Sequence, residues 1–285
     1  MINRNHLYKY MTEHSEEYSL FVFIPYMFGT TYWGMKLFPE KSILIPCLHD
    51  EPYAYIKHFQ KTFPNIAGMI FNSEPEKILA EKIYNLKSVK TLTAGIGMNT
   101  NILANAEDFR KKYNIHEPFI LYSGRKDSGK NIDTLIKYYA EYVKRKNSNL
   151  RLIMIGGGKK INNVTDLGYI PQKDKYNAMS ACEFLCQPSF NESFSLVIME
   201  NWLCKRPVLV HEKCDVTKNF VLQSDGGLYF SNYPEFEACT DYLLKNKDIS
   251  DKMGLNGYKY VNDNFNRDTI TAKYIDFFER IINNK

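Results

Sequence analysis

The chain has 285 residues, of which 44% are hydrophobic, so it can bury the cores of two ordinary domains and is too long for a single small module. Its net charge of +5 comes from 37 Lys and Arg and 32 Asp and Glu that are scattered along the sequence. This pattern lacks the long basic block that follows a nucleic-acid backbone, so it argues against a nucleic-acid partner.

The first 18 residues are polar and charged where a signal peptide needs an apolar core, which favours a cytoplasmic protein. Residues 19–35 are uncharged, but they contain Pro25 and Gly29 and reach only the lower length limit of a membrane span. We expect a buried strand and a loop there, no transmembrane helix, and at most weak peripheral contact with the inner face of a membrane. None of the six cysteines lies in a C-x-x-C pair, which predicts free thiols in a reducing compartment and no zinc site.

Apolar runs of strand length alternate with segments of helical period along the chain, which is typical of an α/β protein with parallel sheets. The predicted strands are Leu20–Tyr26, Ser42–Pro46, Ala67–Phe71, Thr91–Gly95, Phe119–Gly124, Leu150–Gly156, Phe184–Pro188 and Pro207–His211. A helix is predicted after Ser73, which forms a capping box with Glu76, and further amphipathic helices over residues 131–143 and 267–284.

A domain boundary is predicted near residue 115, where a polar helical segment gives way at Pro118 to a new strand. We therefore expect two Rossmann-like domains, 1–115 and 116–285, and the last helix can pack back on the first of them. Ligands of such sheets bind at the carboxyl ends of the strands, so the loops that follow the strands are where a site is expected.

The stretch NESFSLVIME, residues 191–200, leads from a buried strand into a buried helix and carries a glutamate at each end. Glu192 is expected in the loop, and Glu200 about two turns inside the helix. A helix N-terminus offers free amides, so a phosphate can bind there between two carboxylates that accept hydrogen bonds from sugar hydroxyls. The alternative is that Glu192 only caps the helix electrostatically and Glu200 faces solvent. The amides concerned are those of Ser193, Phe194, Ser195 and Leu196.

The loop SGRKDSGKN, residues 123–131, also follows a strand, and it supplies Arg125 and Lys130 to the same edge of the predicted sheet. A diphosphate leaving group needs its negative charge neutralised, and the sequence contains no D-x-D triplet that would hold a metal for this purpose. Arg125 and Lys130 would then serve instead. An ordinary solvated basic loop is the alternative.

From residue 42 onward the chain resembles the retaining glycosyltransferases of family 4, whose GT-B fold has two facing Rossmann-like domains. Glu192 and Glu200 match the E-x7-E signature of that family, and Gly124, Arg125 and Lys130 match its G-R-x-x-x-x-K loop. Further matches are the segments PS before the signature, LIMIGGG, DLGYIP, KRPVLV and GMIFNSEPEKILAEKI.

The resemblance implies a hexosyltransferase that moves a sugar from a nucleotide-diphospho-sugar to a saccharide or lipid-linked acceptor, without a metal or other cofactor. Arg125 and Lys130 would bind the donor diphosphate, and Glu200 its ribose. Glu192 would hold the transferred sugar, and His49 would lie near that sugar. Backbone groups of Tyr169 and Ile170 would hold the base.

Two departures from the family pattern bear on this reading. Ser193 and Ser195 replace the glycines that usually follow the first glutamate of the signature. The first domain is shortened, because a helix-like segment stands where the family has an opening strand and a glycine-rich loop. A non-catalytic nucleotide-sugar-binding or assembly subunit is therefore the alternative function. A Rossmann dehydrogenase is a weaker one, because GGGKK lacks the G-x-G-x-x-G spacing.

Overall fold

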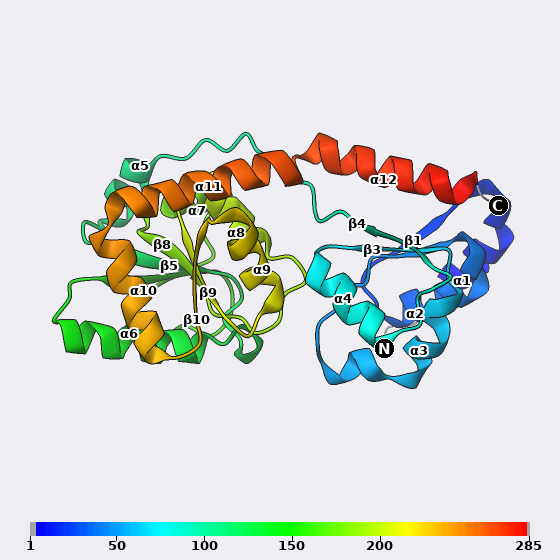
Figure 1. Ribbon diagram of the computed structural model, residues 1–285, viewed down its shortest axis with the longest axis horizontal. Coiled ribbons are helices and arrows are strands. Elements are labelled where there is room, and N and C mark those ends of the chain that lie inside the picture. Colours follow the sequence, from blue (N-terminus) through cyan, green and yellow to red (C-terminus); the bar gives the residue numbers. More distant parts are fainter. Residues whose placement is uncertain (1–3, 284–285) are drawn as a thin grey trace. The chain divides into compact units, whose positions relative to one another are not determined.

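The computed structural model describes residues 4–283 and divides the chain into two compact units. The first unit is Met1–Gly97 with Asp268–Lys285, and the second is Met98–Arg267 (Figure 1). In each unit the strands of one sheet alternate with helices along the chain. This organisation follows from the alternation of apolar strand-length runs and amphipathic segments in the sequence.

Each unit contains one parallel sheet, with strand order β1-β2-β3-β4 in the first and β10-β9-β8-β5-β6-β7 in the second. The parallel α/β architecture and every predicted strand are confirmed, with ends that differ by up to three residues. The strands are β1 (Phe21–Phe23), β2 (Ser42–Leu44), β3 (Gly68–Phe71), β4 (Lys90–Thr93), β5 (Phe119–Ser123), β6 (Arg151–Ile155), β7 (Thr165–Gly168), β8 (Phe184–Gln187), β9 (Val208–His211) and β10 (Gly227–Phe230).

The helices of the first unit lie on both sides of its sheet (Figure 1). They are α1 (Asn5–Glu13), α2 (Gly29–Leu37), α3 (Lys57–Thr62), α4 (Glu74–Ile83) and most of α12 (Arg267–Ile282). The helices of the second unit are α5 (Ala106–Tyr113), α6 (Ile132–Lys146), α7 (Gln172–Ala181), α8 (Leu196–Leu203), α9 (Asp215–Ser224), α10 (Tyr233–Lys245) and α11 (Lys247–Phe265). Among residues 4–283, none of these helices combines the length and apolar character needed to cross a membrane.

Residues 19–35 differ from the expected strand and loop, because α2 begins at Gly29. The residues Gly29, Thr30 and Thr31 have low helix propensity, so a helix start could not be predicted from them. The helix is stabilised by packing instead, since Thr31 and Met35 are buried.

The last helix, α12, packs on the first unit although it is the end of the chain (Figure 1). Phe277 and Ile281 form an apolar cluster with Ile43 and Ile70 of the sheet. A Cβ at Gly68 would come within 2.7 Å of Ile281, so the glycine allows the helix to approach β3 closely.

The boundary between the units lies at residues 97 and 98, earlier than the expected position near residue 115. The polar segment that suggested a linker forms α5, which is held against α7. The Asn105 backbone amide donates to Asn177 Oδ1 at 2.8 Å, and Arg110 donates to the carbonyl of Ala181 at 2.9 Å. A surface helix is polar on its outer side, which is why this polar helical segment suggested a boundary although it belongs to the second unit.

The predicted cap of α4 is present, since Ser73 Oγ accepts a hydrogen bond from the Glu76 amide at 3.3 Å. The Glu76 carboxylate has a further role. It accepts hydrogen bonds from the amides of Leu48 and Asn72, each at 2.6 Å, and so joins α4 to the loops after β2 and β3. Its burial raises the pKa of Glu76 to about 8.

Candidate functional site

The loop after β8 leads into α8 through Ser195, whose φ of 75° lies in the left-handed region. No side chain among the described residues caps this helix, so its first amides are open to a ligand. Ser195 is 8% exposed, and its Oγ makes no hydrogen bond within residues 4–283. The structure therefore places an uncapped helix N-terminus at the carboxyl edge of the sheet, where an anion can bind.

Ser195→Gly is expected to raise the free energy of unfolding by about 1 kcal/mol, because it relieves the left-handed strain and removes an unpaired buried hydroxyl. Urea unfolding followed by the fluorescence of buried Trp202, in the same unit, measures this change. A lower stability of the variant would show that the hydroxyl makes a stabilising hydrogen bond in solution.

Glu192 and Lys130 are brought together by the neighbouring strands β8 and β5. The Lys130 ammonium lies 2.7 Å from Glu192 Oε1, and Gln187 Nε2 donates to the same oxygen at 2.9 Å. The loops are also tied directly, since Asn131 Nδ2 donates to the carbonyl of Pro188 at 3.0 Å. Glu192 is thus one member of a half-buried polar cluster and not simply an electrostatic cap.

Glu200 lies about one turn inside α8, not two as expected, because the helix begins only at Leu196. Its carboxylate is 2.6 Å from the Lys175 ammonium, and it accepts a hydrogen bond from the Tyr176 hydroxyl at 3.5 Å. The Glu200 side chain is only 14% exposed, so it does not face open solvent. Burial raises the pKa of Tyr176.

Lys175 and Tyr176 come from α7, and sequence reasoning missed both. The signature of two glutamates carries no information about α7, which meets α8 only through tertiary packing. A buried carboxylate needs a partner, and Lys175 supplies it here.

Arg125 remains apart from the pair of Lys130 and Glu192. Its side chain is 76% exposed, and its guanidinium lies 3.6 Å from the Asp127 carboxylate. The backbone around it is well fixed, because the Tyr122 hydroxyl donates to the Arg125 carbonyl and the Gly124 amide donates to Ile155. Arg125 is therefore a long, exposed side chain on a backbone held by hydrogen bonds, and its guanidinium can reach toward a bound anion.

A pocket of about 330 Å³ opens at the carboxyl ends of β6 and β7. Tyr169 lines it together with the glycine turn Gly156–Gly158. Beneath the pocket, Lys126 and Asp166 form an ion pair at 2.6 Å with both side chains 2% exposed. Ile170 is half-buried and is followed by Pro171, where α7 is about to begin. The buried ion pair was not predicted from the sequence.

His49 lies in the first unit, in the loop after β2. Its Nδ1 is 4.0 Å from Glu51 Oε1, and the hydroxyl of the buried Tyr26 donates to that oxygen at 2.9 Å. The imidazole is 32% exposed, so it can contact a ligand while Glu51 orients it.

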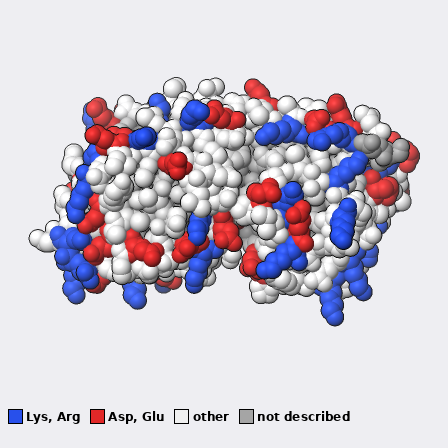
Figure 2. All heavy atoms as spheres, in the orientation of Figure 1, with Lys and Arg blue, Asp and Glu red and all other residues white. Residues whose placement is uncertain are grey.

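The described part of the chain contains no group of three His, Cys, Asp or Glu side chains that could hold a metal ion, and all six cysteines are free. On the face shown in Figure 2, Lys and Arg are interspersed with Asp and Glu. Positive charge near Glu192 and Glu200 comes instead from the individual lysines at 130 and 175.

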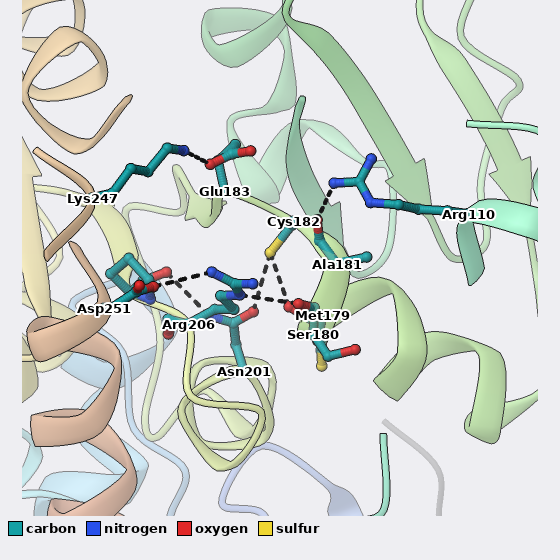
Figure 3. A network of polar contacts seen from close by, with 11 residues as sticks. Arg110, Met179, Ser180, Ala181, Cys182, Glu183, Asn201, Arg206, Lys247 and Asp251 are labelled. Carbon is teal, nitrogen blue, oxygen red and sulfur yellow. Dashed lines mark hydrogen bonds and ion pairs between the residues drawn. The ribbon is translucent and has the colours of Figure 1, made fainter. Parts of the chain in front are cut away.

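A polar network behind the site fixes α8 to its neighbours (Figure 3). Asn201, directly after Glu200 in the sequence, donates through Nδ2 to the carbonyls of Arg206 and Pro207 at 2.8 and 3.1 Å. Arg206 in turn donates to Ser180 at the end of α7 and pairs with Asp251 of α11. These bonds hold the helix that carries Glu200 in one position.

Comparison with protein families places the matching region within the second unit. A family model described as "Glycosyl transferases group 1" matches residues 105–260, just over half of the chain. A curated Campylobacter jejuni protein is 33% identical over 108 residues, and the match covers 33% of this chain and 28% of that protein. Its name is N-acetylgalactosamine-N,N'-diacetylbacillosaminyl-diphospho-undecaprenol 4-alpha-N-acetylgalactosaminyltransferase. The match thus spans less than a third of that relative.

Solved structures resemble the whole chain. A sucrose-phosphate synthase from Thermosynechococcus elongatus superposes with a TM-score of 0.81 at 19% identity, covering 100% of this chain and 81% of that one. HepE of Anabaena, solved with UDP-glucose, gives 0.78 at 15% identity, with coverages of 96% and 82%. WaaG, a glycosyltransferase involved in lipopolysaccharide biosynthesis, gives 0.71 at 15% identity, with coverages of 98% and 84%.

Proposed function

Because the chain belongs to the glycosyl transferases group 1 family and has the GT-B fold, we propose that it transfers a hexose from a nucleotide-diphospho-sugar with retention of anomeric configuration. The acceptor in this proposal is a saccharide or a lipid-linked saccharide. The observation that carries it is the placement of Lys130 and Glu192, 2.7 Å apart, beside the uncapped N-terminus of α8. A cation, a carboxylate and free amides are the groups that a sugar diphosphate requires.

In this proposal the donor separates Lys130 from Glu192. The ammonium then contacts the diphosphate, and the carboxylate accepts hydrogen bonds from hydroxyls of the transferred sugar. The amides from Ser193 to Leu196, at the entry to α8, and the exposed Arg125 side chain add to the positive field around the leaving group. Glu200, freed on one oxygen from Lys175, accepts from the ribose hydroxyls.

The chemistry needs negative charge on the departing diphosphate to be stabilised while positive charge develops at the anomeric carbon. Lys130, Arg125 and the helix amides perform the first task without a metal in this proposal. Glu192 would contact the transferred sugar and hold its anomeric carbon close to the acceptor, and His49 is proposed as a further sugar contact. The retained configuration, the absence of a cofactor and the transfer of a hexose all belong to the proposal.

A lipid-linked acceptor is supported by an apolar pocket of about 330 Å³ in the first unit. It lies between α1 and β1, and its lining includes Leu7, Tyr10, Val22 and Ile24, which are exposed. The Campylobacter relative carries a diphospho-undecaprenol acceptor in its name. We therefore propose that the protein is cytoplasmic and makes weak peripheral contact with the inner face of the membrane.

The proposal predicts that UDP or GDP binds to the chain in the presence of EDTA. Titration calorimetry measures the affinity, with Lys130→Met as the test variant and Lys259→Met as its control. Lys259 pairs with Asp263 one turn away on the surface of α11, so its loss should not affect binding. We expect Lys130→Met to bind the nucleotide more weakly than the unmodified chain and Lys259→Met to bind it equally well. Binding that requires Mg²⁺ or Mn²⁺ would contradict the metal-independent site.

A further inference from the structure

The loop that carries His49, residues 45–51, follows β2 in the first unit. Its backbone turns at Cys47, whose φ of 51° lies in the left-handed region. A residue other than glycine keeps this conformation only where the surrounding contacts fix it, and such residues gather at ligand-binding loops. The contacts on either side of His49 therefore decide where its imidazole lies.

Glu76 of α4 fixes the residue directly before His49. Its side chain is 1% exposed, and Oε1 accepts a hydrogen bond from the Leu48 amide at 2.6 Å. The other carboxylate oxygen accepts from the Asn72 amide at the same distance, and the Asn72 side chain donates to Cys47 Sγ at 3.6 Å. The carboxylate holds these amides firmly, because without it a buried N–H would be left unpaired.

Tyr26, which follows β1, fixes the loop from the other side. Its side chain is fully buried, and its amide donates to the carbonyl of Pro46 at 3.1 Å. Its hydroxyl donates to the Glu51 carboxylate, which lies 4.0 Å from His49 Nδ1. The Glu51 amide also donates to the His49 carbonyl at 2.9 Å. Tyr26 therefore acts on the group that orients the imidazole.

Neither Glu76 nor Tyr26 is exposed enough to contact a ligand, so any effect on a bound sugar must pass through His49. A buried carboxylate is also a costly way to fill a core, since an apolar side chain of the same size would serve packing alone at least as well. The hydrogen bonds to the loop give Glu76 a purpose that packing does not.

We propose that Glu76 and Tyr26 are positioning residues for sugar transfer, and that they act by holding His49 where it contacts the transferred sugar. The inference rests on the proposed function, in which His49 is a sugar contact. It adds two buried residues that influence the reaction without touching the donor or the acceptor.

Steady-state kinetics of transfer or donor hydrolysis test this role. Glu76→Met is similar in size but removes both acceptor oxygens, and Tyr26→Phe removes only the hydroxyl that holds Glu51. We expect each variant to lower kcat about tenfold and to change the donor KM by less than about twofold. The reason is that a displaced His49 affects the reacting sugar more than the nucleotide that dominates donor binding.

A double-mutant cycle separates positioning from general destabilisation. In a His49→Ala background, neither Glu76→Met nor Tyr26→Phe should lower kcat further, because the group that they position is absent. Glu81→Gln is the matched control, since Glu81 lies on the same helix in an exposed pair with Lys77. This control should leave kcat and KM unchanged in both backgrounds.

Hydrogen exchange measured by NMR gives a readout that does not depend on turnover. In Glu76→Met the amides of Leu48 and Asn72 should exchange at least about tenfold faster than in the unmodified chain. The Ile45 amide, which donates to the Phe23 carbonyl at 2.9 Å, should keep its rate and so show that the sheet is intact.

An equal loss of kcat with and without His49 would overturn the proposal. Unchanged exchange of the Leu48 amide in Glu76→Met would do the same, and so would a kcat of Tyr26→Phe that matches the Glu81 control. These outcomes, with an active unmodified chain, would remove only this inference. If the unmodified chain neither transfers nor hydrolyses a nucleotide-sugar, the proposed function itself fails, and this inference fails with it.

Discussion

Glu192→Ala is expected to lower kcat by about 10² or more while changing the KM for the donor much less. The carboxylate lies beside the uncapped α8 N-terminus, where the proposed leaving group binds, and it is already oriented by Gln187 and Lys130 at 2.9 and 2.7 Å. In the transition state it would hold hydroxyls of the transferred sugar close to the reacting carbon. Loss of that positioning affects the chemical step more than donor binding.

Steady-state kinetics of donor hydrolysis or transfer measures this split between kcat and KM. Glu200→Ala is the comparison within the signature, and its effect should appear chiefly in the donor KM, because its proposed contact is with the ribose. Glu212→Ala is the surface control, since Glu212 pairs with Lys218 at 2.8 Å in the same unit. The control should leave both constants unchanged.

Two outcomes would contradict the assignment of Glu192. A kcat equal to that of the unmodified chain would remove it from the reacting centre. A chain that binds a nucleotide-sugar but neither transfers nor hydrolyses it, with any of a range of acceptors, would instead support the non-catalytic binding subunit.

The apolar strands were predictable because a strand buried on both faces needs an uninterrupted apolar run. The runs FILYS and RLIMI show this in β5 and β6. The strands β7 and β10 were missed because they lie at the two edges of the sheet. Edge strands are partly exposed, so β7 (TDLG) lacks an apolar run, and the short β10 (GLYF) begins with a glycine and is only partly buried.

The site was predictable only where its residues follow strands directly. Lys130 and Glu192 could be placed near one another, because they follow the carboxyl ends of β5 and β8. The hydrogen bond between Gln187 and Glu192 could not be predicted, since it depends on side-chain positions within the fold. The partners Lys175 and Lys126 likewise depend on long-range packing, which leaves no fixed spacing in the sequence.

Asp166→Asn is expected to reduce the free energy of unfolding of the second unit by about 3–5 kcal/mol. Asp166 and Lys126 are both 2% exposed, and the substitution leaves the Lys126 ammonium buried without a counter-charge. Burial alone would raise the pKa of Asp166, but the hydrogen bonds from Lys126, Ile161 and Gly168 outweigh it and lower the pKa. The contribution of the carboxylate is therefore present above its unfolded pKa of about 3.9 and is lost as the pH falls below that value.

Urea unfolding followed by Trp202 fluorescence measures this change, in a Trp33→Phe background that removes the other tryptophan of the chain. Asp263→Asn, in the exposed pair with Lys259, is the control and should change stability little. The double variant Lys126→Met with Asp166→Asn should be more stable than Asp166→Asn alone, because it no longer buries an unpaired charge. The difference in the free energy of unfolding between Asp166→Asn and the unmodified chain should also decrease from pH 7 toward pH 3. A loss in Asp166→Asn no larger than in the control, or no recovery in the double variant, would show that the pair is not buried in solution.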